Sequence, residues 1–241
     1  METMEMQHQV MGYDRSTLFS PDGRLLQVEY AQKTIRLGSA SIGLACKDGV
    51  VIIADRRSKD VLITAESAMK IYEVDEHIIA SASGILSDAR ILIERAQLIS
   101  QQHRVTYDSA IDVESVIKEI ADLKQQFTQY GGTRPFGVAI LIAGITGKKP
   151  KIYSSDVTGS YFSYKATAIG EQDEKIKEIL RKKYDENIDI ESGIKLSLDI
   201  FKEILGKNFS VDRFDVGYIK TEDIKIKKIS GDALKKYIKS W

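Results

Sequence analysis

Apolar residues in the middle of the chain alternate with polar or small ones, a pattern typical of strands in a sheet. The clearest case is SASIGLACKDGVVIIAD, residues 39–55, in which two β-type runs flank Lys-Asp-Gly, a strong hairpin signal. Further runs of this kind lie at residues 61–67, 69–84, 138–145, 151–156, 160–170, 214–220 and 224–229. Because hairpins predominate, the sheets are predicted to be mostly antiparallel.

Other segments repeat their apolar residues at helical spacing. Helices are predicted at residues 25–37, 87–103, 112–130, 172–184 and 190–205, with a short last helix ending at Trp241. Ser87 is expected to cap the second of these helices. In the third helix the residues on one face are Val113, Val116, Ile117, Ile120 and Phe127.

The order of these elements predicts the fold. Strands, two helices, strands, two helices and strands follow one another, so each helix pair must cover an outer face of a sheet. We therefore predict an α+β fold, a four-layer αββα sandwich, as a single domain over residues 1–241. The alternative is a chain of two α+β domains, but no stretch rich in proline, glycine or serine marks a boundary between them.

The charge balance argues against two classes of partner. The chain carries 35 basic and 35 acidic side chains, so neither nucleic acid nor an anionic membrane is expected as the main partner. The lysines after residue 220 leave a nucleic-acid patch as an alternative. However, IKIKKI at residues 224–229 alternates isoleucine with lysine, which favours a strand with one face in solvent.

The single cysteine and the three histidines limit the chemistry further. One cysteine excludes an internal disulfide and favours a reducing compartment. Cys46 shares the parity of Ile42, so it is expected to pack as a small core residue. His8, His77 and His103 are scattered without ligand spacing, so no metal or other cofactor is predicted.

The chain shows no targeting or membrane segment. METMEMQHQV, residues 1–10, lacks the basic flank and the apolar stretch of a signal peptide. No apolar run approaches the ~18 to 20 residues that a membrane span requires. We expect a soluble, cytoplasmic protein.

One constellation could support hydrolysis. Ser39 follows a glycine at the head of the first predicted strand, Asp55 ends the second, and Lys70 begins a later one. If the chain were cut before Ser39, the new amine could act as base for the Ser39 hydroxyl, with Lys70 balancing the proton and Asp55 orienting the lysine. Alternatively, Ser39 simply opens a strand and Asp55 opens the polar loop DRRSKD. The spacing alone favours the second interpretation.

Three motifs resemble those of one known family. YDRSTLFSPDGRLLQVEYA, residues 13–31, resembles the signature that opens α subunits of the 20S proteasome. YGGTRPFGV, residues 130–138, and KATAIG, residues 165–170, resemble two further positions in these subunits. The resemblance extends over nearly the whole chain from Gly12 and is closest to the archaeal type, in which one kind of α subunit builds a seven-membered ring. It implies the αββα sandwich of the N-terminal nucleophile hydrolases.

The resemblance also implies that this subunit does not catalyse hydrolysis. Ser39 matches the position at which processing exposes the threonine of proteasome β subunits, and Asp55 and Lys70 match the family aspartate and lysine. Glu171 stands where β subunits have a catalytic-site serine. The hydrolytic framework is thus expected to be vestigial, and the β subunits are expected to cleave the peptide bonds.

The same resemblance divides the chain into three parts. Residues 1–12 would be a gate tail that blocks the axial pore, residues 13–38 a turn and an N-terminal helix, and residues 39–241 the sandwich. The residues that match the cluster stabilising an open gate are Tyr13, Asp14, Arg15, Pro21 and Tyr30. The turn here is one residue shorter than usual, because only Ser16 separates Tyr-Asp-Arg from the threonine.

Two further sites follow from the resemblance. Lys70 would lie in a pocket between neighbouring subunits and receive the C-terminal carboxylate of an activating ATPase complex. Tyr130, Gly131, Gly132 and Thr133 would line the pore constriction and contact unfolded protein substrates. A self-processing hydrolase that uses Ser39 and a plain scaffold ring without a regulated gate remain alternatives.

Overall fold

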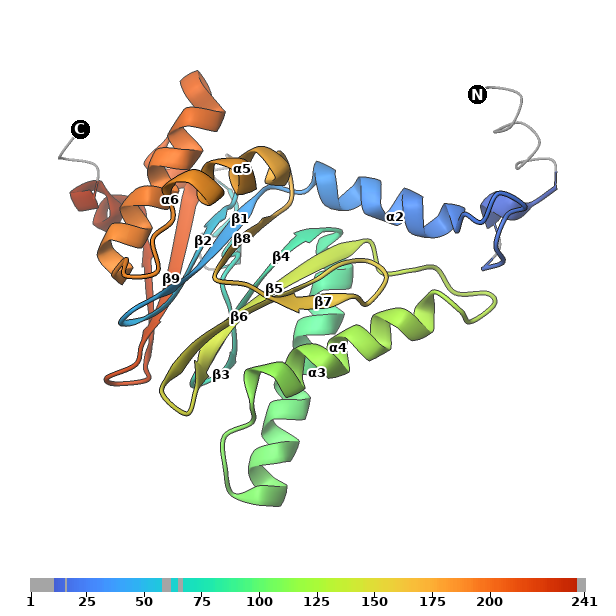
Figure 1. Cartoon of the computed structure of the whole chain (residues 1–241), viewed down its shortest axis with the longest axis horizontal. Helices are drawn as coiled ribbons and strands as arrows, with labels where there is room; N and C mark the ends of the chain where they lie inside the picture. The colour runs from blue at the N-terminus through green and yellow to red at the C-terminus, as the bar shows by residue number, and fades with distance from the viewer. Residues whose placement is uncertain (1–10, 16, 58–61, 65–66, 238–241) are drawn as a thin grey trace.

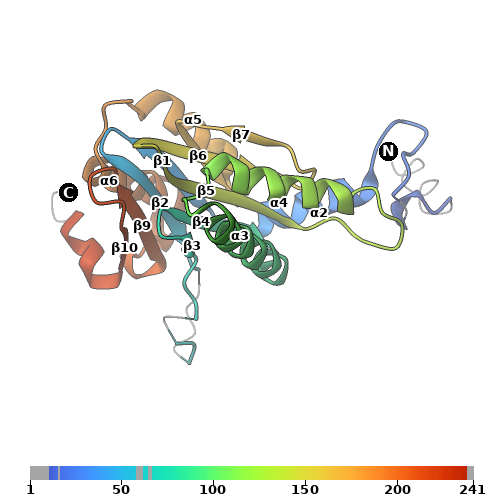
Figure 2. The ribbon, with the colours of Figure 1, turned by 90° about the horizontal axis from the view of Figure 1, so that it is seen from below.

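The computed structural model describes residues 11–15, 17–57, 62–64 and 67–237. Residues 1–10, which form most of the predicted gate tail, lie outside this part, as do Ser16 and residues 238–241. The described strands form two five-stranded sheets, and neighbouring strands in both sheets are antiparallel. Figures 1 and 2 show these sheets between two pairs of helices.

The first sheet has the strand order β10-β9-β2-β1-β8. Its strands are β1 (Ser41–Cys46), β2 (Gly49–Asp55), β8 (Ala166–Ile169), β9 (Phe214–Lys220) and β10 (Ile226–Ser230). The hairpin predicted at Lys-Asp-Gly is confirmed, because β1 and β2 pair from Ser41 with Ala54 to Cys46 with Gly49. The helices α5 (Asp173–Lys183) and α6 (Ile190–Leu205) cover the outer face of this sheet.

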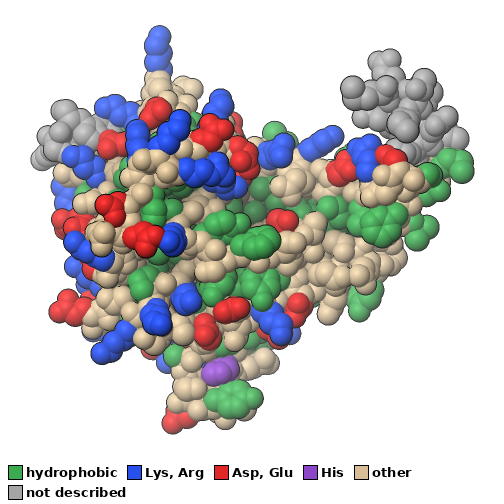
Figure 3. Space-filling model, in the orientation of Figure 1, with side chains coloured by type: hydrophobic (Ala, Val, Ile, Leu, Met, Phe, Trp, Pro, Cys, Tyr) green, Lys and Arg blue, Asp and Glu red, His purple; other side chains and the backbone are tan. Residues whose placement is uncertain are grey.

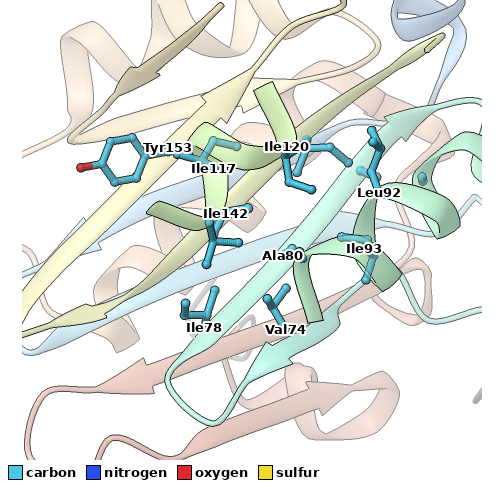
Figure 4. Packing of buried hydrophobic residues seen from close by; sticks show 14 of the residues in the cluster. Val74, Ile78, Ala80, Leu92, Ile93, Ile117, Ile120, Ile142 and Tyr153 are labelled. Carbon is cyan, nitrogen blue, oxygen red and sulfur yellow. The ribbon is translucent and has the colours of Figure 1, made fainter. Parts of the chain in front are cut away.

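The second sheet has the strand order β3-β4-β5-β6-β7. Its strands are β3 (Tyr72–Asp75), β4 (Ile78–Gly84), β5 (Val138–Thr146), β6 (Lys149–Ser155) and β7 (Tyr161–Ser163). The helices α3 (Leu86–Tyr107) and α4 (Val113–Phe127) pack on its outer face. Figure 4 shows this packing, in which Leu92 of α3, Ile117 of α4 and Ile142 of β5 belong to one apolar cluster.

Each central strand is buried on both faces because it lies between two apolar layers. Along β2, Val51 and Ile53 face the α5 and α6 side, whereas Val50 and Ile52 face the other sheet. The burial of β2 is therefore continuous, as expected for a strand with both faces covered. The four-layer αββα sandwich is confirmed, and Cys46 is buried in its core as predicted.

One helix stands apart from the two covering pairs. The helix α2 (Leu26–Leu37) follows the 3₁₀ turn η1 (Tyr13–Arg15) and extends to the end of the molecule at which the chain begins (Figure 1). Its inner end packs into the core between the sheets through Ala31 and Ile35. The loop from α4 to β5 reaches the same end of the molecule in both views (Figures 1 and 2).

Three local predictions are wrong. Ser87 lies inside α3 and does not cap it, because the helix begins one residue earlier, after Ile85, whose amide nitrogen donates to the Gly137 carbonyl oxygen. Residues 62–64 and 67 are not in a strand, although they carry apolar side chains, and Leu62 is 88% exposed. The helix predicted to end at residue 130 ends at Phe127, where the Thr128 hydroxyl bonds back to the Gln125 carbonyl. The short last helix is confirmed as the 3₁₀ helix η4 (Gly231–Tyr237), and its predicted end at Trp241 lies outside the described residues.

Within the described residues, none of the helices combines the length and the apolar character needed to cross a membrane.

Candidate functional site

Ser39 and Lys70 lie together, as the hydrolase interpretation requires. The Lys70 ammonium group (Nζ) donates to the Ser39 hydroxyl at 2.8 Å and to the Ser39 carbonyl oxygen at 2.9 Å. Ser83 also donates to that carbonyl, at 3.0 Å. Lys70 is only 6% exposed, and its burial lowers its pKa to about 8.

Asp55 does not orient Lys70 by direct contact, contrary to the hydrolase interpretation. The Arg213 guanidinium donates to both carboxylate oxygens of Asp55, at 2.6 and 3.1 Å, and the Arg57 amide donates to one of them at 2.9 Å. No ion pair joins Asp55 to Lys70 in the described part of the chain. Asp55 is thus paired with Arg213. Its negative charge acts on Lys70 from a distance and opposes the lowering of the Lys70 pKa by burial.

A buried carboxylate that the sequence analysis missed completes this cluster. Asp215 accepts the Lys70 amide at 3.0 Å, and its other oxygen lies 3.4 Å from the Arg56 guanidinium. Desolvation raises the pKa of Asp215. A signal was present in the sequence, because an aspartate inside the apolar strand FDVGYIK must be buried with a partner.

The segment before Ser39 is held by hydrogen bonds to the residues around it. The Leu37 carbonyl accepts the Arg57 guanidinium at 3.2 Å, and the Gly38 carbonyl accepts the Glu171 amide at 2.8 Å. Arg57 and Glu171 also form an ion pair on the outside of this segment. A side chain at Gly38 would come within 2.3 Å of the Gly84 nitrogen, so only glycine fits there. The hydrolase mechanism needs a free amine on Ser39, and a cut before Ser39 would release the segment that makes these contacts.

The predicted gate residues lie along η1 and the start of α2. Tyr13, Asp14 and Arg15 form η1, and the Gln27 side-chain amide of α2 donates to the Asp14 carbonyl oxygen. One carboxylate oxygen of Asp14 is buried without a hydrogen-bond partner among the described residues. Tyr30 is partly exposed on α2.

The Pro-Asp-Gly turn that precedes α2 is confirmed. Pro21 and Asp22 occupy its centre, and the Gly23 amide donates to the Ser20 carbonyl oxygen at 2.8 Å. Gly23 has φ +77°, which glycine adopts without a steric cost. The Ser20 hydroxyl donates to Asp22 at 2.6 Å and so fixes the direction from which the chain enters α2.

The predicted constriction residues form the exposed tip of the loop between α4 and β5, residues 128–137. Tyr130, Gly131 and Gly132 are exposed, and Gly132 has φ +82°. The Thr133 hydroxyl donates to the Tyr130 carbonyl at 2.7 Å, which closes the tip on itself. Figure 3 shows hydrophobic side chains gathered at the end of the molecule to which α2 and this loop extend.

A metal centre has no support in this geometry. Over residues 11–15, 17–57, 62–64 and 67–237, no three His, Cys, Asp or Glu side chains come together in a group that could hold a metal ion.

Comparison with known proteins identifies the class of this fold. The family described as "Proteasome subunit" matches residues 35–219, and the family described as the N-terminal signature of the A-type proteasome subunits matches residues 13–33. The chain is 44% identical over 229 residues to the proteasome alpha subunit of Archaeoglobus fulgidus, covering 95% of this chain and 93% of that one. It is 43% identical over 230 residues to that of Methanosarcina thermophila, with the same two coverages.

The chain therefore belongs to the proteasome subunit family. Within this family it groups with the alpha subunits, the non-catalytic type of core subunit, which assemble into rings with β subunits for protein degradation. The resemblance found in the three motifs is thus confirmed. The cluster around Ser39 agrees with this class, because both buried carboxylates near Lys70 are already paired with arginines.

Proposed function

We infer that this chain forms the outer ring of a proteasome core, gates the passage of unfolded proteins into the proteolytic chamber, and docks an ATPase activator. One observation carries the inference. The signature segment and the loop of residues 128–137 lie far apart in the sequence, yet both extend to the same end of the molecule (Figures 1 and 2). A ring that joins subunits at this end would bring gate and constriction together around one axis.

The proposed ring has seven copies of this chain, next to a ring of β subunits. Large apolar side chains at the signature end support a contact between subunits, because such side chains are usually covered in an assembly. Met11, Leu18 and Phe19 are 66 to 70% exposed in the single chain. We propose that residues 1–241 act as one domain in the cytoplasm, without a cofactor, a nucleic acid or a membrane as partner.

The proposed gate consists of the tail, residues 1–12, and the cluster of Tyr13, Asp14, Arg15, Pro21 and Tyr30. The buried carboxylate oxygen of Asp14 supports this role, since an oxygen buried without a partner is costly, and a rearrangement of η1 on ring assembly that brings it a donor would be favourable. The turn at Pro21 would then aim the tail across the axis.

Lys70 is the proposed receptor for the C-terminal carboxylate of the ATPase. Its pKa is lowered to about 8 by burial, so a docked carboxylate would restore the charged form and be bound in a desolvated site. Removing such a buried charge partner costs about 2 to 5 kcal/mol per bound tail. To reach the carboxylate, the ammonium group would have to exchange one of its two bonds to Ser39.

Deletion of residues 2–12 tests the gate in a particle assembled with β subunits. A true gate predicts faster hydrolysis of a short peptide, because the tail no longer blocks the pore. A tail of the same length and composition in scrambled order serves as the control. An unchanged rate after the deletion would contradict gating and favour a plain scaffold ring.

Replacing Lys70 with alanine tests the activator site separately. The variant particle should assemble and keep its basal peptide hydrolysis but lose stimulation by the ATPase complex. Lys165→Ala is the matched control, since Lys165 is an exposed lysine paired with Glu186 on the surface. Preserved stimulation of Lys70→Ala would remove the docking assignment and leave the gate untouched.

A further inference from the structure

Among the described residues, the hydrogen bonds of the loop tip at residues 130–133 join it only to the neighbouring end of α4 and to itself. Its bonds are local: the Tyr130 amide donates to the Gln126 carbonyl, and Thr133 bonds back to Tyr130. A side chain added at Gly131 or Gly132 would meet no atom within 4 Å. The position of the tip must therefore be set where the loop joins the rest of the fold.

At that junction a bidentate ion pair ties the loop to α3. The Arg134 guanidinium donates to both oxygens of Asp88, at 2.7 and 2.8 Å, and the Gly137 amide donates to the same carboxylate at 2.9 Å. The Asp88 side chain is only 6% exposed, whereas that of Arg134 is 57% exposed. The bond from Arg134 lowers the pKa of Asp88, and the first turn of a helix also favours a carboxylate.

The peptide group of Gly137 connects this pair to α2. The Gly137 carbonyl oxygen accepts the Thr34 hydroxyl of α2 at 2.8 Å and the Ile85 amide at 3.0 Å. A side chain at Gly137 would come within 2.7 Å of both Thr34 and Ile85, so the three segments touch at this one residue. The Thr34 hydroxyl also lies 2.7 Å from the Ala31 carbonyl of its own helix, and its single proton can serve only one acceptor at a time.

We propose that Asp88 and Arg134 are positioning residues for the loop tip at residues 130–133, and that Thr34, through Gly137, fixes α2 against the same junction. The inference rests on the proposed function, since it takes the tip to contact the passing polypeptide. An extended polypeptide must stay in contact with the tip throughout its passage, whereas a short peptide diffuses past it. Loss of the ion pair therefore affects the two kinds of substrate differently.

Amide hydrogen exchange of the full chain tests the positioning directly. Arg134→Ala and Asp88→Asn are each expected to speed exchange at residues 130–133 about tenfold, because the tip opens without unfolding the sandwich. Arg134→Lys keeps one charged donor, so its exchange rate at the tip should lie between that of the unaltered chain and that of Arg134→Ala. Arg90→Ala, which removes the exposed pair with Glu94 on the same helix, is the matched control and should leave the loop unchanged. Unchanged exchange at the tip in both Arg134→Ala and Asp88→Asn would overturn the proposal.

Degradation by the assembled particle tests the consequence. Both variants should degrade an unfolded protein such as casein about three- to tenfold more slowly, with hydrolysis of a tripeptide unchanged, and Arg134→Lys should recover part of the loss. The double variant should be no slower than either single one, since the two residues act as one pair. Equal rates on casein for the variants and the unaltered particle would also overturn the proposal. Failure of the tail deletion to raise tripeptide hydrolysis would instead remove the gate and leave this result standing.

Discussion

Two buried lysines in this molecule bind a serine in almost the same way. Lys70 donates to the hydroxyl and the carbonyl oxygen of Ser39 at 2.8 and 2.9 Å, and Lys124 donates to the same two atoms of Ser155 at 2.9 and 3.2 Å. Ser39 is the residue that the resemblance assigns to the nucleophile position, whereas Ser155 ends β6, under α4. A buried lysine that donates to a serine hydroxyl therefore occurs twice in this structure, so this contact alone does not identify a nucleophile.

The surroundings of the two lysines differ. Burial lowers the pKa of Lys124 to about 7, and Asp156 is the carboxylate that opposes this effect. At Lys70 burial is opposed by two carboxylates, Asp55 and Asp215, and the pKa falls only to about 8. Lys124 lies between α4 and β6, where it contacts Ser155. Lys70 belongs to a charged cluster with Asp55, Asp215 and their arginines, next to Ser39. Of the two lysines, Lys70 is therefore the one proposed to exchange a bond to Ser39 for a bond to a partner's carboxylate.

Replacement of Lys124 with alanine should have the largest effect on stability. The change leaves a cavity in a fully buried site and removes the donor to Ser155, so we expect a loss of about 2 to 5 kcal/mol. Urea unfolding at matched protein concentration measures this loss. Lys124→Met, which keeps most of the volume, should lose less. A loss below about 1 kcal/mol for Lys124→Ala would show that the pair does not support the fold.

Replacement of Lys70 with alanine should cost less, about 1 to 3 kcal/mol in the same measurement. The Ser39 carbonyl keeps its bond from Ser83, and the backbone amide of residue 70 keeps its bond to Asp215. If Lys70→Ala were instead more destabilising than Lys124→Ala, Lys70 would be a structural residue first, and its proposed role in docking would lose its support.

The two lysines also predict how stability depends on pH. Each has a folded pKa below the ordinary value of 10.5, so the folded chain binds fewer protons than the unfolded chain between about pH 7 and 10.5. The free energy of unfolding should therefore rise with pH in this window, by up to about 1.4 kcal/mol per pH unit for each lysine. Lys124→Met should flatten the curve from about pH 7 upwards. An identical slope in the variant and the unaltered chain would contradict the assignment.

Replacement of Arg57 with alanine should have the smallest effect. The ion pair between Arg57 and Glu171 is nearly half exposed, and such pairs contribute about 0 to 1 kcal/mol. The bond from the Glu171 amide to the Gly38 carbonyl remains. Thermal unfolding of the variant measures the change. A loss of stability well above this range would show that the ion pair between Arg57 and Glu171 supports the cluster around Ser39.

The layers of the fold could be predicted because the apolar residues alternate along the strands and recur at helical spacing in the helices. The segment at residues 62–64 could not, since its apolar pattern has no neighbouring strand to pair with, and pairing is not visible in one sequence. The cap at Ser87 failed for a similar reason. The start of α3 is set by a bond from Ile85 to Gly137, which lies 52 residues further along the chain.

Part of the candidate site was also within reach of the sequence. The hydrolase interpretation had grouped Ser39 with Lys70. The ion pair between Asp55 and Arg213 was not foreseen, because it joins residues 158 positions apart. Lys124 could have been found, since it falls between Ile120 and Phe127 on the apolar face predicted for α4. A lysine at such a position has to be buried with partners.

The intact mass of this chain, recovered from a particle assembled with β subunits, tests the central claim most directly. The account predicts a chain that keeps everything before Ser39, with a mass close to 27.0 kDa, so that Ser39 has no free amine. A chain that begins at Ser39 would contradict the account. The signature segment would then be a propeptide, and the cluster of Ser39 and Lys70 would be the active site of a hydrolase.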